Sequence, residues 1–182
     1  MSDTRVVNGS VAELSAAFDR SFALPPIDAP PGIEDFINIR VVGDPYAVRL
    51  AEITAVVARR TVIPVPASSR HFLGLAGIRG GIVPVFGLAS MLGYAGDSDA
   101  PAWMVLVGVE EPIALAFSEF EGHLRLPASA IHASASRGAA QQHVREVAST
   151  DAGVRAIISI PLIVAAIRNR IGHDQRQPSV DQ

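Results

Sequence analysis

Short apolar segments separated by turn residues are the feature that most constrains the fold of this chain. From about residue 35 to residue 160, segments of strand length recur at spacings of roughly 8–12 residues, with glycine, proline or charged residues between them. Little sequence is left for helices that could cross between parallel strands. The pattern predicts a mainly β protein, a barrel or a sandwich, with about nine or ten strands and a few short helices.

Three pairs of these segments have the layout of β-hairpins. Their turns are expected at residues 43–45, 110–111 and 150–153, where Gly-Asp-Pro, Glu-Glu and Thr-Asp-Ala-Gly stand between apolar runs. Residues 50–57 fit either a short helix or a further strand. Helices are expected at 88–92, because Gly93 can end one, and at about 161–171, because proline at 161 suits a first helical turn.

Residues 72–88 form the densest apolar stretch, Phe-Leu-Gly-Leu-Ala-Gly-Ile-Arg-Gly-Gly-Ile-Val-Pro-Val-Phe-Gly-Leu. Two strands flank Arg79-Gly80-Gly81, where glycine supplies the positive φ that a tight turn needs. Such a turn holds Arg79 out in solvent, and arginine is a residue type enriched at interface hot spots. Pro84 cannot donate to a β-ladder, so we expect its strand at a sheet edge or at a bulge.

Composition excludes several classes of protein. The 182 residues include no cysteine, and all 15 basic residues are arginine. The chain therefore has no disulfide framework, cysteine nucleophile or thiolate zinc site, and it lacks the lysine of a phosphate-binding loop or a Schiff base. The net charge of −3 and the aromatic content of 5% argue against a nucleic-acid surface. No apolar run approaches the roughly 18 residues of a membrane span, so we expect no membrane insertion and a cytoplasmic location.

Residues with catalytic or metal-binding potential are scattered. The histidines at 71, 123, 132, 143 and 173 show no metal-ligand spacing, and no serine stands in a nucleophile motif. The neighbouring carboxylates at 110–111 and at 119 and 121 fit solvated turn charges better than general acid–base pairs. We therefore expect no catalytic residue, no metal and no cofactor.

The first 34 residues differ from the remainder. Ser10 and Glu13 have the spacing of a capping box, and apolar residues follow at 11, 14, 18 and 22, which predicts an amphipathic helix over 11–22. A proline-rich linker follows it. The apolar face of this helix either folds back on the core or docks on another protein. The expected organisation is this helix and linker over 1–34, a β domain over 35–171 and a flexible tail over 172–182.

The run from Gly77 to Leu88, preceded by Phe72-Leu-Gly74, resembles the central motif of CheW-like coupling domains. The order of the other segments is also similar, including Gly43-Asp-Pro-Tyr-Ala-Val48 and Val62-Ile-Pro64 before the motif. The resemblance covers about residues 35–171 and is strongest over 72–93. It implies two intertwined five-stranded barrels of the Src-homology-3-like type, with no active site.

The resemblance also implies a non-enzymatic adaptor that joins methyl-accepting chemoreceptors to a CheA-type histidine kinase. The partner-binding residues that it implies lie mostly in the central hairpin: Arg79, Gly77, Gly80, Ile82, Val83, Pro84 and, before it, Ile53. Two other classes stay open from the residues alone. A small β-barrel ligand-binding domain or hydrolase of unknown substrate would need a deep pocket with convergent polar groups. An oligonucleotide-binding barrel is disfavoured by the composition.

Overall fold

The computed structural model describes residues 32–58, 60–67, 69–95, 101–134 and 142–174. The chain divides into two units, residues 1–31 and residues 32–182, and all described residues belong to the second. The expected helix over 11–22, most of its linker, and the tail beyond residue 174 lie outside the described residues, so these expectations stay predictions.

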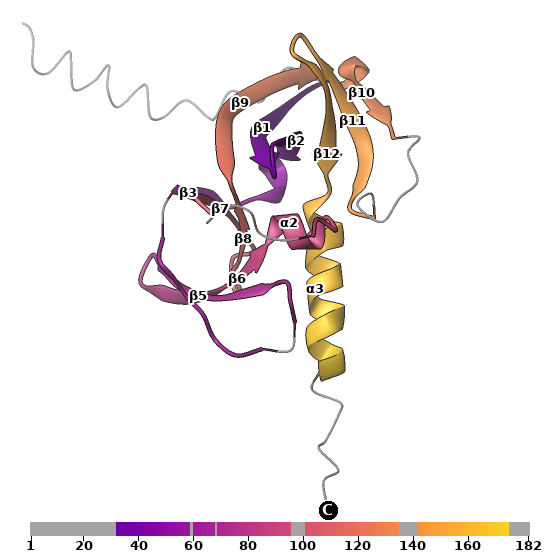
Figure 1. Cartoon of the computed structure of the whole chain (residues 1–182). Coiled ribbons are helices and arrows are strands. Elements are labelled where there is room, and N and C mark those ends of the chain that lie inside the picture. Colours follow the sequence, from indigo (N-terminus) through magenta and orange to yellow (C-terminus); the bar gives the residue numbers. More distant parts are fainter. Residues whose placement is uncertain (1–31, 59, 68, 96–100, 135–141, 175–182) are drawn as a thin grey trace, which may run out of the picture. The chain divides into compact units, whose positions relative to one another are not determined.

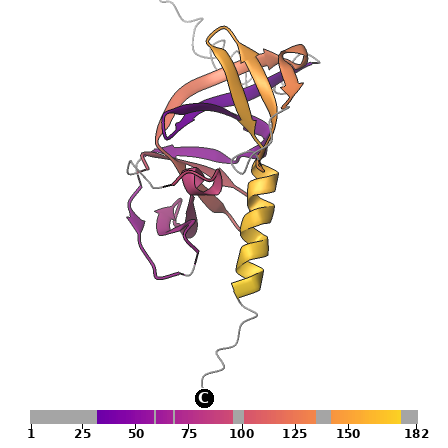
Figure 2. The same cartoon turned by 45° about the vertical axis from the view of Figure 1, so that its right-hand side comes forward.

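The described residues form two six-stranded sheets (Figures 1 and 2). The first sheet has the order β10-β11-β12-β2-β1-β9. Its strands, in chain order, are β1 (Ile33–Val41), β2 (Asp44–Arg49), β9 (Glu119–Pro127), β10 (Ile131–Ala133), β11 (Val144–Thr150) and β12 (Gly153–Ile158). All its pairings are antiparallel except the one between β12 and β2.

The second sheet is inserted in the chain between β2 and β9 and has the order β3-β7-β8-β6-β5-β4. Its strands are β3 (Ala55–Ala58), β4 (Val62–Ile63), β5 (Phe72–Ile78), β6 (Gly81–Gly87), β7 (Trp103–Val107) and β8 (Ile113–Phe117). Only β6 and β8 pair in parallel. The chain therefore starts the first barrel with β1 and β2, builds the whole second barrel from β3 to β8, and then completes the first barrel with β9 to β12.

Helices are few among the described residues. Short 3-10 helices lie at Leu50–Glu52 and Ala128–Ala130, α2 covers Leu88–Met91, and α3 covers Ile160–Asp174. In α3 the buried isoleucines follow at spacings of three and four, which places them on one face. The Glu52 carboxylate accepts a hydrogen bond from the first backbone N–H of α3 at 2.9 Å, and the N-terminal end of a helix favours such a negative charge.

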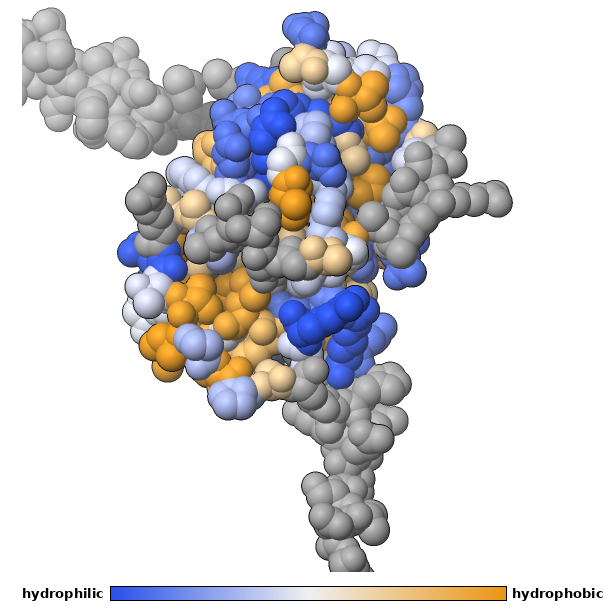
Figure 3. Space-filling view, viewed as in Figure 1, coloured by the Kyte–Doolittle hydropathy of each residue, from blue (hydrophilic) through white to orange (hydrophobic). Residues whose placement is uncertain are grey.

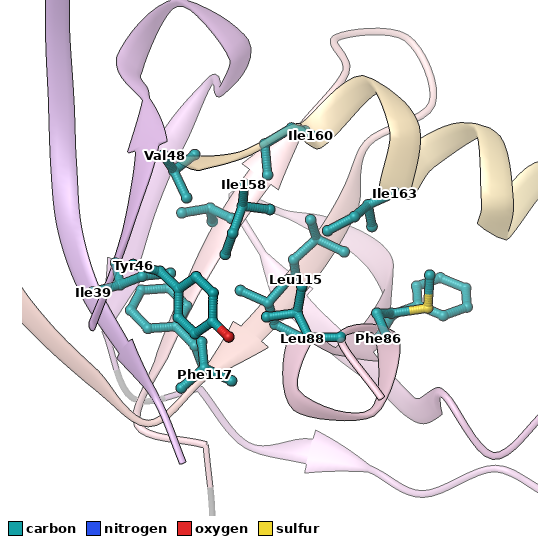
Figure 4. Packing of buried hydrophobic residues seen from close by; sticks show 14 of the residues in the cluster. Ile39, Tyr46, Val48, Phe86, Leu88, Leu115, Phe117, Ile158, Ile160 and Ile163 are labelled. Carbon is teal, nitrogen blue, oxygen red and sulfur yellow. The ribbon is translucent and has the colours of Figure 1, made fainter. Parts of the chain in front are cut away.

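Buried apolar side chains form three clusters. One fills the first barrel, with Phe36 and Ile157 among its members, and one fills the second, with Ile78 and Val85. The largest cluster lies between them and takes side chains from both sheets, from α2 and from α3. Figure 4 shows members of this central cluster pointing toward one another from β1, β2, β6, β8, β12 and α3.

A chain of phenol hydrogen bonds joins the segment after α2 to the first sheet. The Tyr94 hydroxyl, just after α2, donates to the Asp44 carboxylate of β2 at 2.5 Å, and the Tyr46 hydroxyl lies 2.7 Å from the Tyr94 hydroxyl. Burial raises the pKa of both phenols, so both hydroxyls stay protonated at neutral pH. The bonds fix the segment after α2 against the first barrel.

The expected fold class and the three hairpins are confirmed, and the strand count is revised. Each sheet has six strands, not five, because the short strands β4 and β10 add to the edges. Residues 50–57 were expected to form either a short helix or a strand, and they contain one after the other: a 3-10 helix and then the start of β3. The first turn lies at Val42–Gly43, so Pro45 belongs to β2.

The prediction for Pro84 was wrong in one respect. Its strand β6 lies inside the second sheet, between β8 and β5, and not at an edge. Pro84 pairs with Leu75 of β5, and the ladder with β8 begins one residue later, at Val85. The missing N–H therefore stands just outside the paired stretch with β8, where it removes no ladder bond.

Candidate protein-docking surface

The β5–β6 hairpin has a two-residue turn made of Arg79 and Gly80. Ile78 and Gly81 are the last paired residues on either side, and both turn residues have positive φ, 51° for Arg79 and 80° for Gly80. This combination is the type I′ turn, whose twist matches that of the flanking strands. The sequence folds this way locally because Gly80 adopts the left-handed conformation without a steric penalty.

Arg79 adopts the same left-handed conformation at a cost. A side chain other than glycine, asparagine or aspartate loses about 1 kcal/mol in this region. Arg79 is exposed and makes no hydrogen bond or ion pair with the residues that the structure describes. The guanidinium is therefore available for a contact outside the chain.

Below the turn, one face of the hairpin is apolar and open to solvent. Ile63 of β4, Leu75 of β5 and Pro84 of β6 stand opposite one another across the strands, and so do Gly77 and Ile82. Opposed residues share a face of the sheet. We call these five residues the outer hairpin face. Ile82 is 78% exposed and Ile63 is 63% exposed. Figure 3 shows a continuous apolar patch over this part of the molecule.

The other expected partner-binding residues lie in different places. Val83 is 3% exposed and packs in the interior of the second barrel, so it supports the hairpin from beneath. Ile53 packs against the central cluster. The structure therefore brings five of the seven expected residues together at the hairpin, and it places Val83 and Ile53 where they act through packing.

A neighbouring turn contributes a residue that the sequence analysis missed. Because β6 and β8 run in parallel, the turn before β6 and the turn before β8 lie at the same end of the sheet. Val109, in the turn before β8, is 86% exposed. The sequence does carry a signal for Val109, because an apolar residue stands next to Glu110 and Glu111 in an expected turn. This end of the sheet offers apolar side chains and charges of both signs.

Charge pairing differs between the two barrels. In the first, Arg49 binds the carboxylates of Glu34 and Glu146, both at 2.7 Å, and Glu121 bridges Arg155 and Arg40, both at 2.6 Å. In the second, the arginines at 60, 70 and 79 are exposed and have no ion pair among the described residues. Sequence explains the contrast, because no aspartate or glutamate occurs between Ile53 and Gly96. This signal was also missed.

The described residues contain no cluster of three or more histidine, aspartate or glutamate side chains that could hold a metal ion. No helix among them is both long and apolar enough to cross a membrane.

Comparisons with known proteins fit this architecture. The family model of the CheW-like domain matches residues 35–168. Among solved structures, the chain is similar to the scaffolding protein TtCheW from Thermoanaerobacter tengcongensis, with a TM-score of 0.61 and 16% sequence identity. The similarity covers 69% of this chain and 88% of that one, and at this identity it shows the fold. No curated protein sequence matches the chain.

Proposed function

Since the chain belongs to the CheW-like domain family, whose members are non-enzymatic scaffolds of chemotaxis signalling, we propose that it couples a methyl-accepting chemoreceptor to a CheA-type histidine kinase. In this role it holds the two partners together and transforms neither. The turn residues Arg79 and Gly80 and the outer hairpin face are the surface that we assign to the kinase.

One observation carries the proposal: the β5–β6 hairpin exposes an apolar face and ends in an exposed arginine that has no ion pair among the described residues. Exposed apolar side chains rimmed by polar groups are typical of protein contact sites. Arginine adds a planar fork of five donors that can bind carboxylates or backbone carbonyls of a partner. Gly77 keeps the middle of the face flat, because it adds no side chain between Leu75 and Arg79.

A reconstitution experiment tests the coupling. Receptor-containing membranes, the kinase and this chain are mixed, and the kinase that sediments with the membranes is measured. We expect the kinase to sediment only when this chain is present. If the chain binds neither partner, or if the kinase sediments equally well without it, the proposed coupling is wrong.

A matched pair of variants assigns the surface. Ile82→Asp places a charge on the outer hairpin face, and Val154→Asp places the same charge at an exposed apolar residue on the β11–β12 hairpin. We expect Ile82→Asp to lower kinase binding at least tenfold and Val154→Asp to leave it within about twofold. Equal effects of the two variants would contradict the assignment to this face.

A further inference from the structure

A second charged surface lies away from the Arg79 turn. Arg70 stands just before β5, whereas Arg79 follows it, so the two are separated by the length of the strand, about 23 Å for seven residues. Arg170 is exposed on α3, and its charge acts on His71 together with that of Arg70. We call Arg70 and Arg170 the basic corner. Figure 3 shows strongly hydrophilic side chains over α3, beside the apolar patch of the second barrel.

Two buried histidines lie beneath this corner. His71 is 6% exposed and His143 is 7% exposed, and the Nδ1 atom of each has no hydrogen-bond partner among the described residues. Their backbones are fixed, because the carbonyl of His71 accepts from the Gly87 N–H and that of His143 accepts from the Ser159 N–H, both at 2.8 Å. Unpaired polar atoms at this depth are uncommon in folded proteins.

Among the described residues, the charges that act on the two histidines are all positive. Burial lowers the pKa of the His71 imidazole, and Arg170, Arg70 and His143 lower it further, against a hydrogen bond with the Ser90 backbone of α2. Burial and Arg170 also lower the pKa of His143. No carboxylate among the described side chains acts on either group. The next carboxylate along α3 in sequence is Asp174, whose side chain is not among those described.

We propose that the basic corner binds a carboxylate-rich, partly apolar segment of a partner protein, and that this binding takes up protons at His71 and His143. Two exposed cations need negative charge, which a bare phosphate could also supply. Val65, which is 41% exposed and lies five residues before Arg70, favours a polypeptide, because only a polypeptide offers apolar side chains to cover it as well as carboxylates for the arginines.

Proton uptake follows from the same arrangement. In the free protein, a proton added at Nδ1 of either histidine would create a positive charge close to the arginines. None of the described residues offers that proton a hydrogen-bond acceptor. Bound carboxylates bring negative charge to the corner and so favour the imidazolium form of both rings. By linkage, if the bound segment raises proton affinity, then protons raise affinity for the segment. Binding is therefore tighter at pH 6.0 than at pH 7.5.

Fluorescence anisotropy with the full chain tests the site. The probe is a fluorescein-labelled helical peptide of leucine and glutamate, about 14 residues or 21 Å long. We expect binding that is about fivefold tighter at pH 6.0 than at pH 7.5 and that weakens with added salt. We expect Arg170→Glu to lower affinity about tenfold. Arg125→Glu is the control, because it makes the same charge change on β9 of the other barrel. We expect it to leave the affinity for the peptide within about twofold.

Calorimetry in two buffers of different ionisation enthalpy measures the protons directly and needs no variant. Net uptake near pH 6.5 supports the proposal, and no uptake overturns the linkage. Equal affinities of Arg170→Glu and Arg125→Glu for the peptide overturn the site. A lysine–leucine peptide of the same length should not bind. Vesicles containing phosphatidylglycerol that bind better than the peptide would show a lipid surface instead. These outcomes do not depend on kinase binding at the Arg79 turn.

Discussion

The β1–β2 and β5–β6 hairpins have the same turn and different surroundings. Val42–Gly43 closes the first with φ values of 52° and 84°, and Arg79–Gly80 closes the second with 51° and 80°. In the first hairpin, the two faces of β1 pack into two different apolar clusters, one within the first barrel and one between the barrels. In the second, one face packs into the second barrel and the outer hairpin face stays open.

This comparison separates what the fold requires from what it allows. The left-handed first turn position holds valine in one hairpin and arginine in the other, so the turn itself does not require arginine. Both faces of the first hairpin carry buried side chains, such as Ile39 on one and Phe36 on the other. The open face and the exposed arginine of the second hairpin, which the turn does not require, support the proposed contact with a partner.

The largest expected effect concerns how β5 meets β4. A methyl group added at Gly74, where φ is 137°, would lie 2.1 Å from the Ile63 carbonyl oxygen. We expect Gly74→Ala to lower the free energy of unfolding by about 3 kcal/mol, since the contact is with backbone that cannot move aside. Gly77→Ala, with open space around it, should leave that free energy unchanged or raise it by up to about 1 kcal/mol. Urea titration checks both, and equal losses would contradict the assigned close approach.

The next effect is on binding. Arg79→Glu should weaken kinase binding by about 2 kcal/mol, or about thirtyfold, because it reverses the charge at the tip of the docking surface. Val42→Glu introduces the same residue at the equivalent turn position of the other hairpin and should change the affinity less than twofold. Calorimetric titration with the kinase's regulatory domain gives both values. An unchanged affinity for Arg79→Glu would remove this arginine from the contact.

A smaller effect is expected on the stability of both turns. Asparagine adopts the left-handed conformation more readily than arginine or valine. Val42→Asn and Arg79→Asn should each raise the free energy of unfolding by about 0.5–1 kcal/mol, with the larger gain for the β-branched valine. Only Arg79→Asn should weaken kinase binding. If both variants destabilise the fold, the turns are not strained as described.

The smallest effect is on pH dependence and falls on one hairpin. Histidine in the unfolded chain has a pKa near 6.5, and the pKa of both His71 and His143 is lower in the folded chain. At a pH between the folded and the unfolded pKa, the unfolded chain therefore binds more protons than the folded one. Their contribution to stability is full above pH 6.5 and declines as the pH falls below it. His71 anchors β6 through Gly87, so amide protection should decline in β5–β6 before β1–β2 between pH 7.5 and pH 6.0. A free energy of unfolding that rises as the pH falls from 7.5 to 6.0 would contradict this prediction.

Much of the fold followed from local patterns. Glycine and proline between short apolar runs located the hairpins, and the Arg79-Gly80 turn followed from the need for positive φ at the second position. The left-handed Val42 could not be predicted in this way, because valine disfavours that conformation and only pairing across the sheet enforces it. The interior position of Pro84 also depends on tertiary register, since it is allowed only where the β8 ladder has not begun.

The candidate site was predictable in part. Its centre, Arg79 with Gly77, Gly80 and Ile82, was found from the hairpin and from the family resemblance. Val83 was assigned with them from the family resemblance, but successive residues of a strand point to opposite faces, and Val83 is buried. Val109 belongs to the same end of the sheet through a parallel pairing of β6 and β8, which no local pattern indicates.

Hydrogen exchange of the free and kinase-bound chain tests the docking surface most directly. Backbone amides of β5, β6 and their Arg79–Gly80 turn should gain protection on binding, and those of the Val42–Gly43 turn should not. Protection confined to the first hairpin, or absent from both hairpins while the kinase is fully bound, would contradict the assignment of the open hairpin as the contact.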